Sequence, residues 1–151
     1  MDQRKACRKQ ALDLLARREH SRLELERKLS ARSYLQETID DVLDALETEG
    51  LLEEARFVES FVRARIGKGQ GPNRIRADLV RRGVAEVTIQ AGLREAQHDW
   101  SALAAEARRK RFGTGRPDDF AERARQMRFL QYRGFEGVQI EAALDLAADS
   151  D

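Results

Sequence analysis

Residues 51–84 read LLEEARFVESFVRARIGKGQGPNRIRADLVRRGV, and this stretch sets the organisation of the whole chain. Its first part predicts an amphipathic helix, because apolar side chains recur three and four residues apart and therefore share one helical face. These side chains belong to Phe57, Val58, Phe61, Val62 and Ile66. The stretch thus begins with a helix that has one side to bury.

A glycine-rich turn follows this helix. Three glycines between residues 67 and 71 disfavour its continuation, and Pro72 suits the first turn of a new helix because its missing N–H needs no partner there. In the second helix Ile75 and Leu79 lie four residues apart on the inner face, and Gly83 offers a C-cap. The sequence therefore predicts a helix, a turn and a short basic helix.

Four short motifs occur in order within this stretch. They are Arg56-Phe57, Phe61-Val62-x-x-Arg65, Gly69-x-Gly71-Pro72-x-Arg74-Ile75 and Arg81-Arg82-Gly83-Val84. On these motifs the chain resembles the RecX regulatory proteins, the bacterial modulators of the RecA recombinase. The resemblance extends to residues 21–29, with the pattern S-x-x-E-L-x-x-K-L, and to residues 129–135, so it covers nearly the whole chain. One departure is Gln126, which stands where Ile75 and Leu25 would align, and we therefore expect Met127 to carry that inner face.

The same helical pattern occurs three times. Leu29, Leu79 and Leu130 lie at equivalent places, and this period near 50 residues indicates tandem modules. We predict an all-α protein of three three-helix repeats, with boundaries at residues 1–50, 51–98 and 99–151, the last residues, 147–151, being frayed. A coincidence of helix lengths is the alternative, but the repeated order of basic helix, glycine turn, basic helix and acidic helix favours true repeats.

Other local patterns add detail to this prediction. Ser21 and Glu24 form a candidate capping box, and Gly50 ends the third helix, while the third helix of the second repeat is expected from residue 86 to about 97. Further inner-face residues are Leu35, Ile39, Val42, Leu43 and Leu46 in the first repeat, Val87, Ile89, Leu93 and Ala96 in the second, and Phe120, Ala124, Leu130, Val138, Ile140 and Leu144 in the third.

Composition favours small modules over one large core. The 151 residues are 36% charged and only 6% aromatic, whereas 41% hydrophobic residues with helical spacing argue against a disordered chain. The single Cys7 excludes an intramolecular disulfide and fits a reducing compartment. Since no apolar run has the length of a membrane span and the polar N-terminus lacks a signal-peptide core, we expect a cytoplasmic protein.

Charge is arranged in alternating blocks although the formal net charge is only +1. Residues 62–83 carry seven Lys or Arg and one acid, residues 108–133 carry nine and three, and acidic blocks separate them. Stacked repeats would align these blocks into a basic and an acidic stripe. The predicted partner-binding or DNA-binding basic stripe is Arg63, Arg65, Lys68, Arg74, Arg76, Arg81, Arg82, Arg108, Arg109, Lys110, Arg111, Arg128 and Arg133. The alternative for each of these side chains is simple solvation of a helix.

Reactive groups do not converge in the sequence. The glycine turn lacks the spacing of a phosphate-binding P-loop, and it joins two helices without a preceding strand. His20 and His98 have no second histidine or cysteine at metal-ligand spacing, so we interpret both as surface histidines. We therefore predict no catalytic residues, no metal site and no cofactor, and hence a protein that is not an enzyme.

The family resemblance implies a function. It implies an elongated, curved array of three-helix repeats that binds RecA and lies in the groove of the RecA filament on single-stranded DNA. Such a protein would inhibit strand exchange, ATP hydrolysis and co-protease activity, and we expect a monomer with at most weak direct DNA binding. Two alternatives stay open: a DNA-binding protein built of helix-turn-helix-like modules, and a scaffold for another helical partner.

Overall fold

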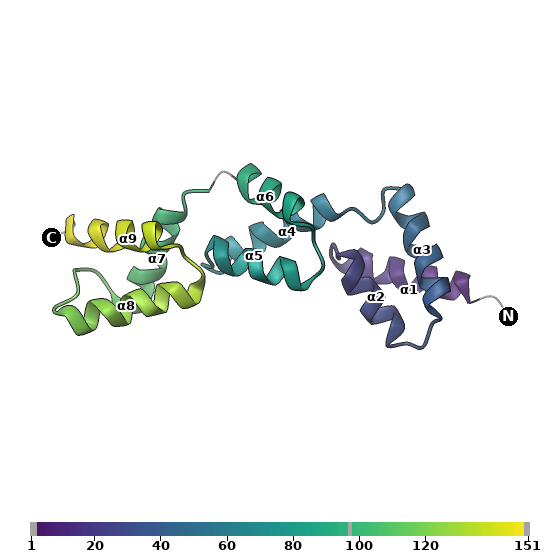
Figure 1. Cartoon of the computed structure of the whole chain (residues 1–151), viewed down its shortest axis with the longest axis horizontal. Helices are drawn as coiled ribbons and strands as arrows, with labels where there is room; N and C mark the ends of the chain where they lie inside the picture. Colours follow the sequence, from purple (N-terminus) through teal and green to yellow (C-terminus); the bar gives the residue numbers. More distant parts are fainter. Residues whose placement is uncertain (1–2, 97, 150–151) are drawn as a thin grey trace. The chain divides into compact units, whose positions relative to one another are not determined.

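The computed structural model describes residues 3–96 and 98–149, and within them it contains nine α-helices and no β-strand. The helices are α1 (Arg4–Arg17), α2 (Arg22–Ser30), α3 (Gln36–Thr48), α4 (Glu54–Gly67), α5 (Pro72–Arg81), α6 (Glu86–Glu95), α7 (Trp100–Phe112), α8 (Phe120–Arg133) and α9 (Gly137–Asp149) (Figure 1). The predicted all-α class is therefore confirmed.

The chain divides into two compact units. Unit 1 contains the described residues of Met1–Ser60 together with Leu79–Gly92, and unit 2 contains those of Phe61–Asp78 together with Leu93–Asp151. All three divisions, after residues 60, 78 and 92, fall inside helices, so α4, α5 and α6 each contribute residues to both units. The repeat boundaries at residues 50 and 98 stay predictions.

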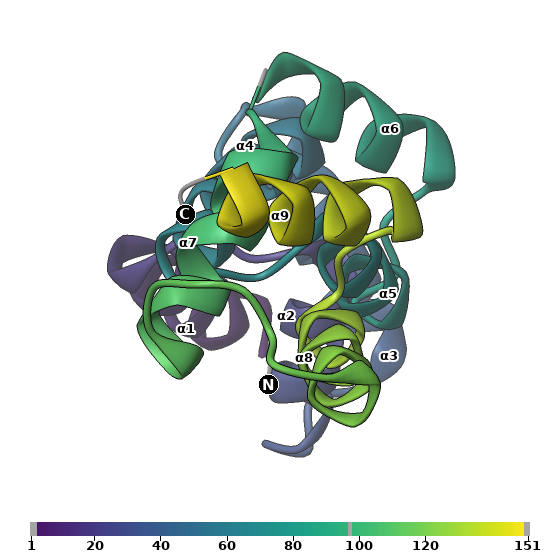
Figure 2. The same ribbon diagram turned by 90° about the vertical axis from the view of Figure 1, so that its left-hand side faces the viewer.

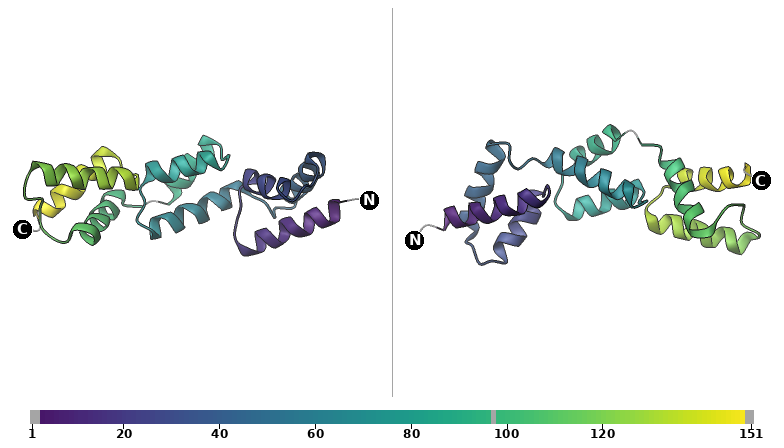
Figure 3. Two further views of the ribbon diagram at one scale, coloured as in Figure 1. Left: turned by 90° about the horizontal axis from the view of Figure 1, so that it is seen from below. Right: turned by 180° about the vertical axis from the view of Figure 1, so that it is seen from behind.

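Helices α1, α2 and α3 pack on one another in unit 1 (Figure 3). Their apolar faces form one core, because residues three and four apart on each helix point the same way. The buried members of this core are Cys7, Ala11, Leu14, Leu25, Leu29, Ile39, Val42, Leu43, Leu46 and Leu52. Most inner-face positions predicted for the first repeat are thus confirmed.

The predicted capping box at the start of α2 is present. The Ser21 hydroxyl accepts a hydrogen bond from the N–H of Glu24 at 3.1 Å, and the Glu24 carboxylate accepts one from the N–H of Ser21 at 3.0 Å. Arg18 adds two donors to the same carboxylate, at 3.2 and 3.1 Å. Two of the orphan N–H groups at this helix start are therefore satisfied, which contributes about 1 kcal/mol.

Unit 2 contains α7, α8 and α9, with α7 and α9 packed against each other (Figure 2). Its core consists of Ala104, Ala107, Leu130, Phe135, Ile140, Ala143 and Leu144. Aspartates cap the N-termini of α7 and α8. The Asp99 carboxylate accepts a hydrogen bond from the N–H of Ala102 at 3.0 Å, and the Asp119 carboxylate accepts one from the N–H of Glu122 at 2.8 Å. Both caps hold helix starts that face the surface of this unit.

Five apolar residues that were expected on inner faces are exposed, and the smallest of them, Ala96, follows the end of α6. Leu35 is 68% exposed, Val87 73%, Phe120 87% and Val138 79%. Leu35 is the N-cap residue of α3, ahead of the buried face. Val87 and Val138 lie two residues before Ile89 and Ile140, which are buried, and residues two apart on a helix do not share a face.

The ends of two helices differ slightly from expectation. Helix α6 ends at Glu95, and Gln97, where the sequence predicted its end, lies outside the described residues. Helix α9 continues to Asp149, into the segment predicted to fray, while residues 150–151 also lie outside the described part. Within the described residues, none of the helices has both the length and the apolar composition for crossing a membrane.

His20 is buried, which corrects its interpretation as a surface histidine. Its side chain is 1% exposed, with Nδ1 at 3.0 Å from the Arg18 carbonyl and Nε2 at 2.9 Å from Nζ of Lys28. Because a carbonyl only accepts, Nδ1 carries the proton and Nε2 accepts from the lysine. Burial lowers the pKa of His20, and the neighbouring cations Arg18 and Lys28 lower this pKa further. The imidazole is therefore held neutral between α1 and α2.

The neutral His20 predicts a loss of stability on the acid side of neutrality. In the unfolded chain the ring takes up a proton near pH 6.5, whereas its lowered pKa keeps the folded ring neutral to a lower pH. The unfolded state then binds more protons, so the free energy of unfolding falls as the pH drops below about 6.5. We expect the Tm of His20→Gln to fall less between about pH 7 and pH 5 than that of the wild type. His98→Gln, at an exposed position, is the control and should keep the wild-type slope.

Candidate interaction surface

The glycine-rich turn between α4 and α5 packs directly on the turn between α8 and α9. Within unit 2, Gly71 donates its N–H to the carbonyl of Arg133 at 2.8 Å, and Asn73 donates to the carbonyl of Gly134 at 2.9 Å. A Cβ atom on Gly71 would lie 2.5 Å from the carbonyl carbon of Gly134. Only a residue without a side chain fits here, because two backbones are in contact.

Gly134 completes this contact from the other side. Its φ angle is +99°, which L residues with side chains rarely adopt, and a Cβ there would lie 2.3 Å from Cβ of Arg74. We call residues 67–73 with residues 133–135 the turn joint. The joint fixes the N-terminus of α5 against the C-terminus of α8, and it holds the backbone of Arg74 in place.

The turn joint brings together three members of the predicted basic stripe. The Arg133 guanidinium donates to the carbonyl of Lys68 at 2.9 Å and lies 5.3 Å from the centroid of the Phe129 ring. The Arg74 guanidinium lies 5.3 Å from the centroid of the Tyr132 ring. Both arginines are half-buried, with their stems packed and their charged heads positioned by aromatic rings.

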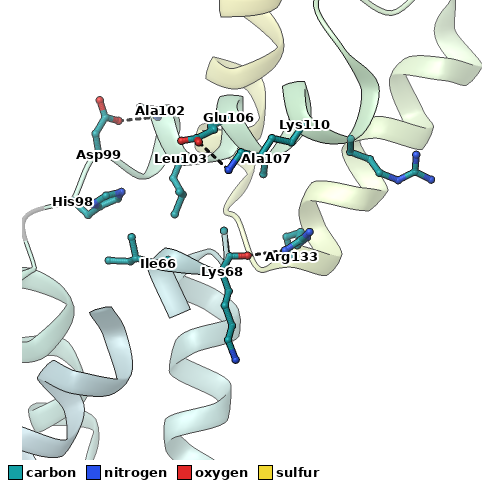
Figure 4. A pocket seen from close by; sticks show the side chains of 13 residues that line it. Ile66, Lys68, His98, Asp99, Ala102, Leu103, Glu106, Ala107, Lys110 and Arg133 are labelled. Carbon is teal, nitrogen blue, oxygen red and sulfur yellow. Dashed lines mark hydrogen bonds and ion pairs between the residues drawn. The ribbon is translucent and has the colours of Figure 1, made fainter. Parts of the chain in front are cut away.

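A groove of about 650 Å³ opens beside the joint (Figure 4). Its cationic lining residues are Lys68, Lys110, Arg111 and Arg133, and Ile66, Leu103 and Ala107 supply apolar surface. The two carboxylates that line the groove, those of Glu106 and Asp99, both accept hydrogen bonds from other groups of the chain. Glu106 pairs with Lys110 at 3.0 Å, and this hydrogen bond lowers the pKa of Glu106, while Asp99 caps α7. The groove therefore presents a positive electrostatic surface.

Arg65 belongs to the internal structure of unit 2 more than to its surface. Its side chain is only 16% exposed and forms an ion pair with Asp78, which is 14% exposed. The same guanidinium donates to Gln70 at 2.8 Å and lies 4.3 Å from the centroid of Phe61. This arginine joins α4 to α5 and contributes little to an exposed stripe, because its charge is already neutralised.

Arg108 is buried, which corrects its assignment to the basic stripe. It is 3% exposed, and its Nε donates to Oε1 of Gln126 at 2.7 Å. The other guanidinium nitrogens donate to the carbonyls of Gly113, at 3.4 Å, and Gly115. A charge buried in this way needs several acceptors, and the α7–α8 loop supplies them. Arg108 therefore holds that loop and is not available to a partner.

The other predicted residues have varied surroundings. Arg63, Lys68, Arg81, Arg109, Lys110, Arg111 and Arg128 are exposed, whereas Arg74, Arg76, Arg82 and Arg133 are half-buried. Arg81 and Arg82 lie in unit 1, where Nε of Arg82 is 3.6 Å from the Glu24 carboxylate, and the remaining members lie in unit 2. A single stripe through both units stays a prediction.

Two exposed aromatic side chains on α8 were missed. Tyr132 is 74% exposed and Phe120 is 87% exposed, although the sequence placed Phe120 at a core-like position and gave Tyr132 no role. Apolar periodicity could not reveal Tyr132, since Phe129 and Leu130 beside it carry the inner pattern. The proximity of Tyr132 to Arg74 depends on the turn joint, which brings α5 to α8.

Among residues 3–96 and 98–149 the structure has no group of three or more His, Cys, Asp or Glu side chains that could bind a metal ion. Cys7 lies in the core of unit 1, where burial raises the pKa of its thiol. This cysteine is therefore a packing residue in the described structure.

Comparisons with known proteins identify the family. Three family models match in chain order: the first three-helix domain of RecX at residues 7–46, the second at residues 54–93 and the third at residues 99–144. The chain belongs to the RecX family of regulatory proteins. The three-helix organisation predicted from the repeats is thereby confirmed.

Individual relatives agree with this assignment. The regulatory protein RecX of Halorhodospira halophila (strain DSM 244 / SL1) is 51% identical over 146 residues, which cover 97% of this chain and 90% of that relative. The regulatory protein RecX of Pseudomonas putida (strain GB-1) is 51% identical over 130 residues, or 86% of this chain and 83% of that relative. The match therefore extends through most of both chains.

Solved structures show the same fold at lower identity. A crystal structure of RecX from Lactobacillus salivarius has a TM-score of 0.80 at 20% identity and covers 97% of both chains. A second crystal structure, of a regulatory protein RecX, also has a TM-score of 0.80, at 22% identity, over 95% of this chain and 72% of that one.

The departure from the RecX pattern at Gln126 now has a structural account. Gln126 is 3% exposed and occupies the inner face itself, where it accepts the hydrogen bond from Arg108. Met127, which was expected to carry this inner face, is partly buried and packs against the core beside Gln126. A polar pair thus replaces an apolar contact at this position.

The turn joint predicts a sharp contrast between two glycines. Gly71→Ala should lower the free energy of unfolding by about 2 kcal/mol or more, because the new Cβ would force two backbones apart and break their hydrogen bonds. Gly67→Ala is the matched control, since nothing lies within 4 Å of its Cβ position. Thermal unfolding followed by circular dichroism measures both, and equal Tm values for the two variants would contradict a tight joint.

The buried pair of Arg108 and Gln126 predicts that substitutions at Arg108 and at the adjacent Arg109 differ strongly in their effect on stability. Arg108→Met should lower the free energy of unfolding by about 2–3 kcal/mol, since Gln126 would lose its donor inside the core. Arg109→Met, at an exposed position, should change it by less than about 0.5 kcal/mol. The double variant Arg108→Met with Gln126→Leu should recover part of the loss, because both polar partners are then replaced. Denaturant unfolding of all three variants checks this, and a stable single Arg108 variant would contradict it.

Proposed function

We propose that this chain is a non-enzymatic regulator that binds RecA and its nucleoprotein filament on single-stranded DNA. It inhibits the recombinase, ATPase and co-protease activities of RecA and thereby modulates recombination, DNA repair and the SOS response. It acts in the cytoplasm as a monomer, without a cofactor. The unpaired Cys7 thiol in the core of unit 1 fits a reducing compartment.

The observation that carries this proposal is the family match through all three domains. The three RecX domains follow in order from residue 7 to residue 144, and 51% identity extends over 97% of the chain in one relative. A regulator that acts through its surface needs an array of modules, and all three matched domains lie in this chain. This favours a shared mode of action over a shared fold alone.

The cationic residues of unit 2 offer a physical route to the partner. Arg109, Lys110 and Arg111 form an exposed run at the end of α7, next to the groove. A charged partner feels this local field within a Debye length of about 8 Å, not the net charge of the whole chain. Binding through these residues accelerates association and weakens as salt is added.

The acidic helices α3 and α9 disfavour the alternative of a sequence-specific DNA-binding protein. The third helix of the first domain, α3, carries Asp41, Asp44 and Glu47 on exposed positions, and α9 carries Glu141 and Asp145. Side chains with this charge would face the negative groove of a duplex unfavourably. The helix-turn-helix alternative is therefore ranked second, and duplex binding without RecA is its test.

The deciding measurement is single-stranded-DNA-dependent ATP hydrolysis by the cognate RecA during titration with this protein. We expect inhibition at concentrations well below those at which the protein binds bare DNA in the same buffer. The double variant Arg109→Glu with Arg111→Glu should weaken inhibition by about tenfold or more, because it reverses two exposed charges beside the groove.

A matched control distinguishes the effect of charge beside the groove from the effect of the net charge of the chain. Lys5→Glu with Arg17→Glu reverses two exposed charges on α1, which lies outside the predicted stripe, and should leave inhibition close to the wild-type level. Circular dichroism verifies that both variants remain folded. Inhibition that only follows occupancy of DNA, or that falls equally in both variants, would contradict the proposal.

A further inference from the structure

The outer face of α8 combines aromatic and cationic side chains. Its exposed residues are Phe120, Ala121, Arg125, Arg128, Gln131 and Tyr132. The sole acid of this helix, Glu122, is half-buried and pairs with Arg125 at 3.0 Å. The face therefore presents two aromatic rings and two arginines without an exposed carboxylate.

Tyr132 is the best-supported member of this face. It is 74% exposed, and Arg128 lies one helical turn before it, at the four-residue spacing that makes two side chains neighbours. Arg74 approaches the same ring from α5, with its guanidinium 5.3 Å from the ring centroid. An aromatic ring between two arginines is thus offered to the solvent.

The turn joint holds this arrangement before any ligand arrives. The backbone of Gly134 packs on Cβ of Arg74, and the N–H of Asn73 donates to the carbonyl of Gly134 at 2.9 Å. The main-chain segments that carry Arg74 and Tyr132 are therefore held next to each other. A ligand that stacks here avoids part of the cost of ordering the site.

We propose that the outer face of α8 with Arg74 binds a single strand of nucleic acid, and that a base stacks at Tyr132. Arg128 and Arg74 pair with the phosphates on either side of that base. Aromatic rings interleaved with cations are the common means of binding single strands, because every base has a π-face and every linkage has a charge. Phe120 lies about 18 Å further along the helix axis, so the face is long enough for several nucleotides.

A protein partner fits this face less well. Tyrosine and arginine are also frequent in protein hot spots, but those spots gather around a buried apolar centre. The exposed residues of α8 include no Leu, Ile, Val or Met. The charge is positive and the only large apolar groups are rings, and this combination matches a polyanion with stacked bases.

The test measures binding without RecA. Fluorescence anisotropy compares a labelled oligo-dT strand with an abasic strand of the same length, which keeps the phosphates but has no bases to stack. Tyr132→Ala should weaken binding of oligo-dT by about 5- to 100-fold and leave binding of the abasic strand unchanged. Tyr132→Phe keeps the ring and should stay within about twofold of the wild type, whereas Arg128→Ala should weaken both strands.

Several outcomes would overturn this inference. They are an absence of oligo-dT binding by the wild type, equal losses on both strands for Tyr132→Ala, and no loss at all in that variant while it remains folded. The result is independent of the proposed function. A wild type that binds oligo-dT through Tyr132 but leaves RecA hydrolysis unaffected would refute only the regulation of RecA, and inhibition without Tyr132-dependent binding would refute only the stacking site.

Discussion

The backbone contact between Gly71 and Gly134 is the constraint on which the candidate surface depends. Two chain segments more than sixty residues apart are hydrogen-bonded through their main chains, with no side chain between them. Arg74 is held over Tyr132 and Arg133 is held on Lys68 as consequences of this contact. Glycine at these two positions thus sets the geometry of the candidate surface, although it has no side chain of its own.

Short-range sequence patterns predicted the helices well, but they assigned some exposed residues to the core. The capping box at Ser21 and the buried centres of the helices follow from contacts within a few residues of sequence, so the pattern alone sufficed. Val87 and Val138 were misplaced because each lies two residues before a buried isoleucine, and residues two apart on a helix do not share a face.

The candidate site could be predicted only as a set of charges. In the sequence, Arg65 and Arg108 look as available to a partner as Arg109. In the structure, Arg65 pairs with Asp78 and Arg108 donates to buried Gln126. Gln126 did offer a hint, because a polar residue at an inner position requires a partner. Its partner lies eighteen residues earlier on another helix, and only the packing of α7 on α8 identifies it.

Arg108 and Arg109 show why a basic stripe has to be defined by helix faces. Adjacent residues on a helix point about 100° apart, so one cation of a run can face the interior while the next faces the surface. The inward cation must be neutralised by acceptors and contributes to folding, and the outward cation keeps its field for a partner. The exposed positive charge of the candidate surface is therefore smaller than the sequence suggests, because Arg65 and Arg108 are engaged inside unit 2. Side chains that are already held by neighbouring backbone and rings would lose less conformational freedom on binding a ligand than freely moving ones.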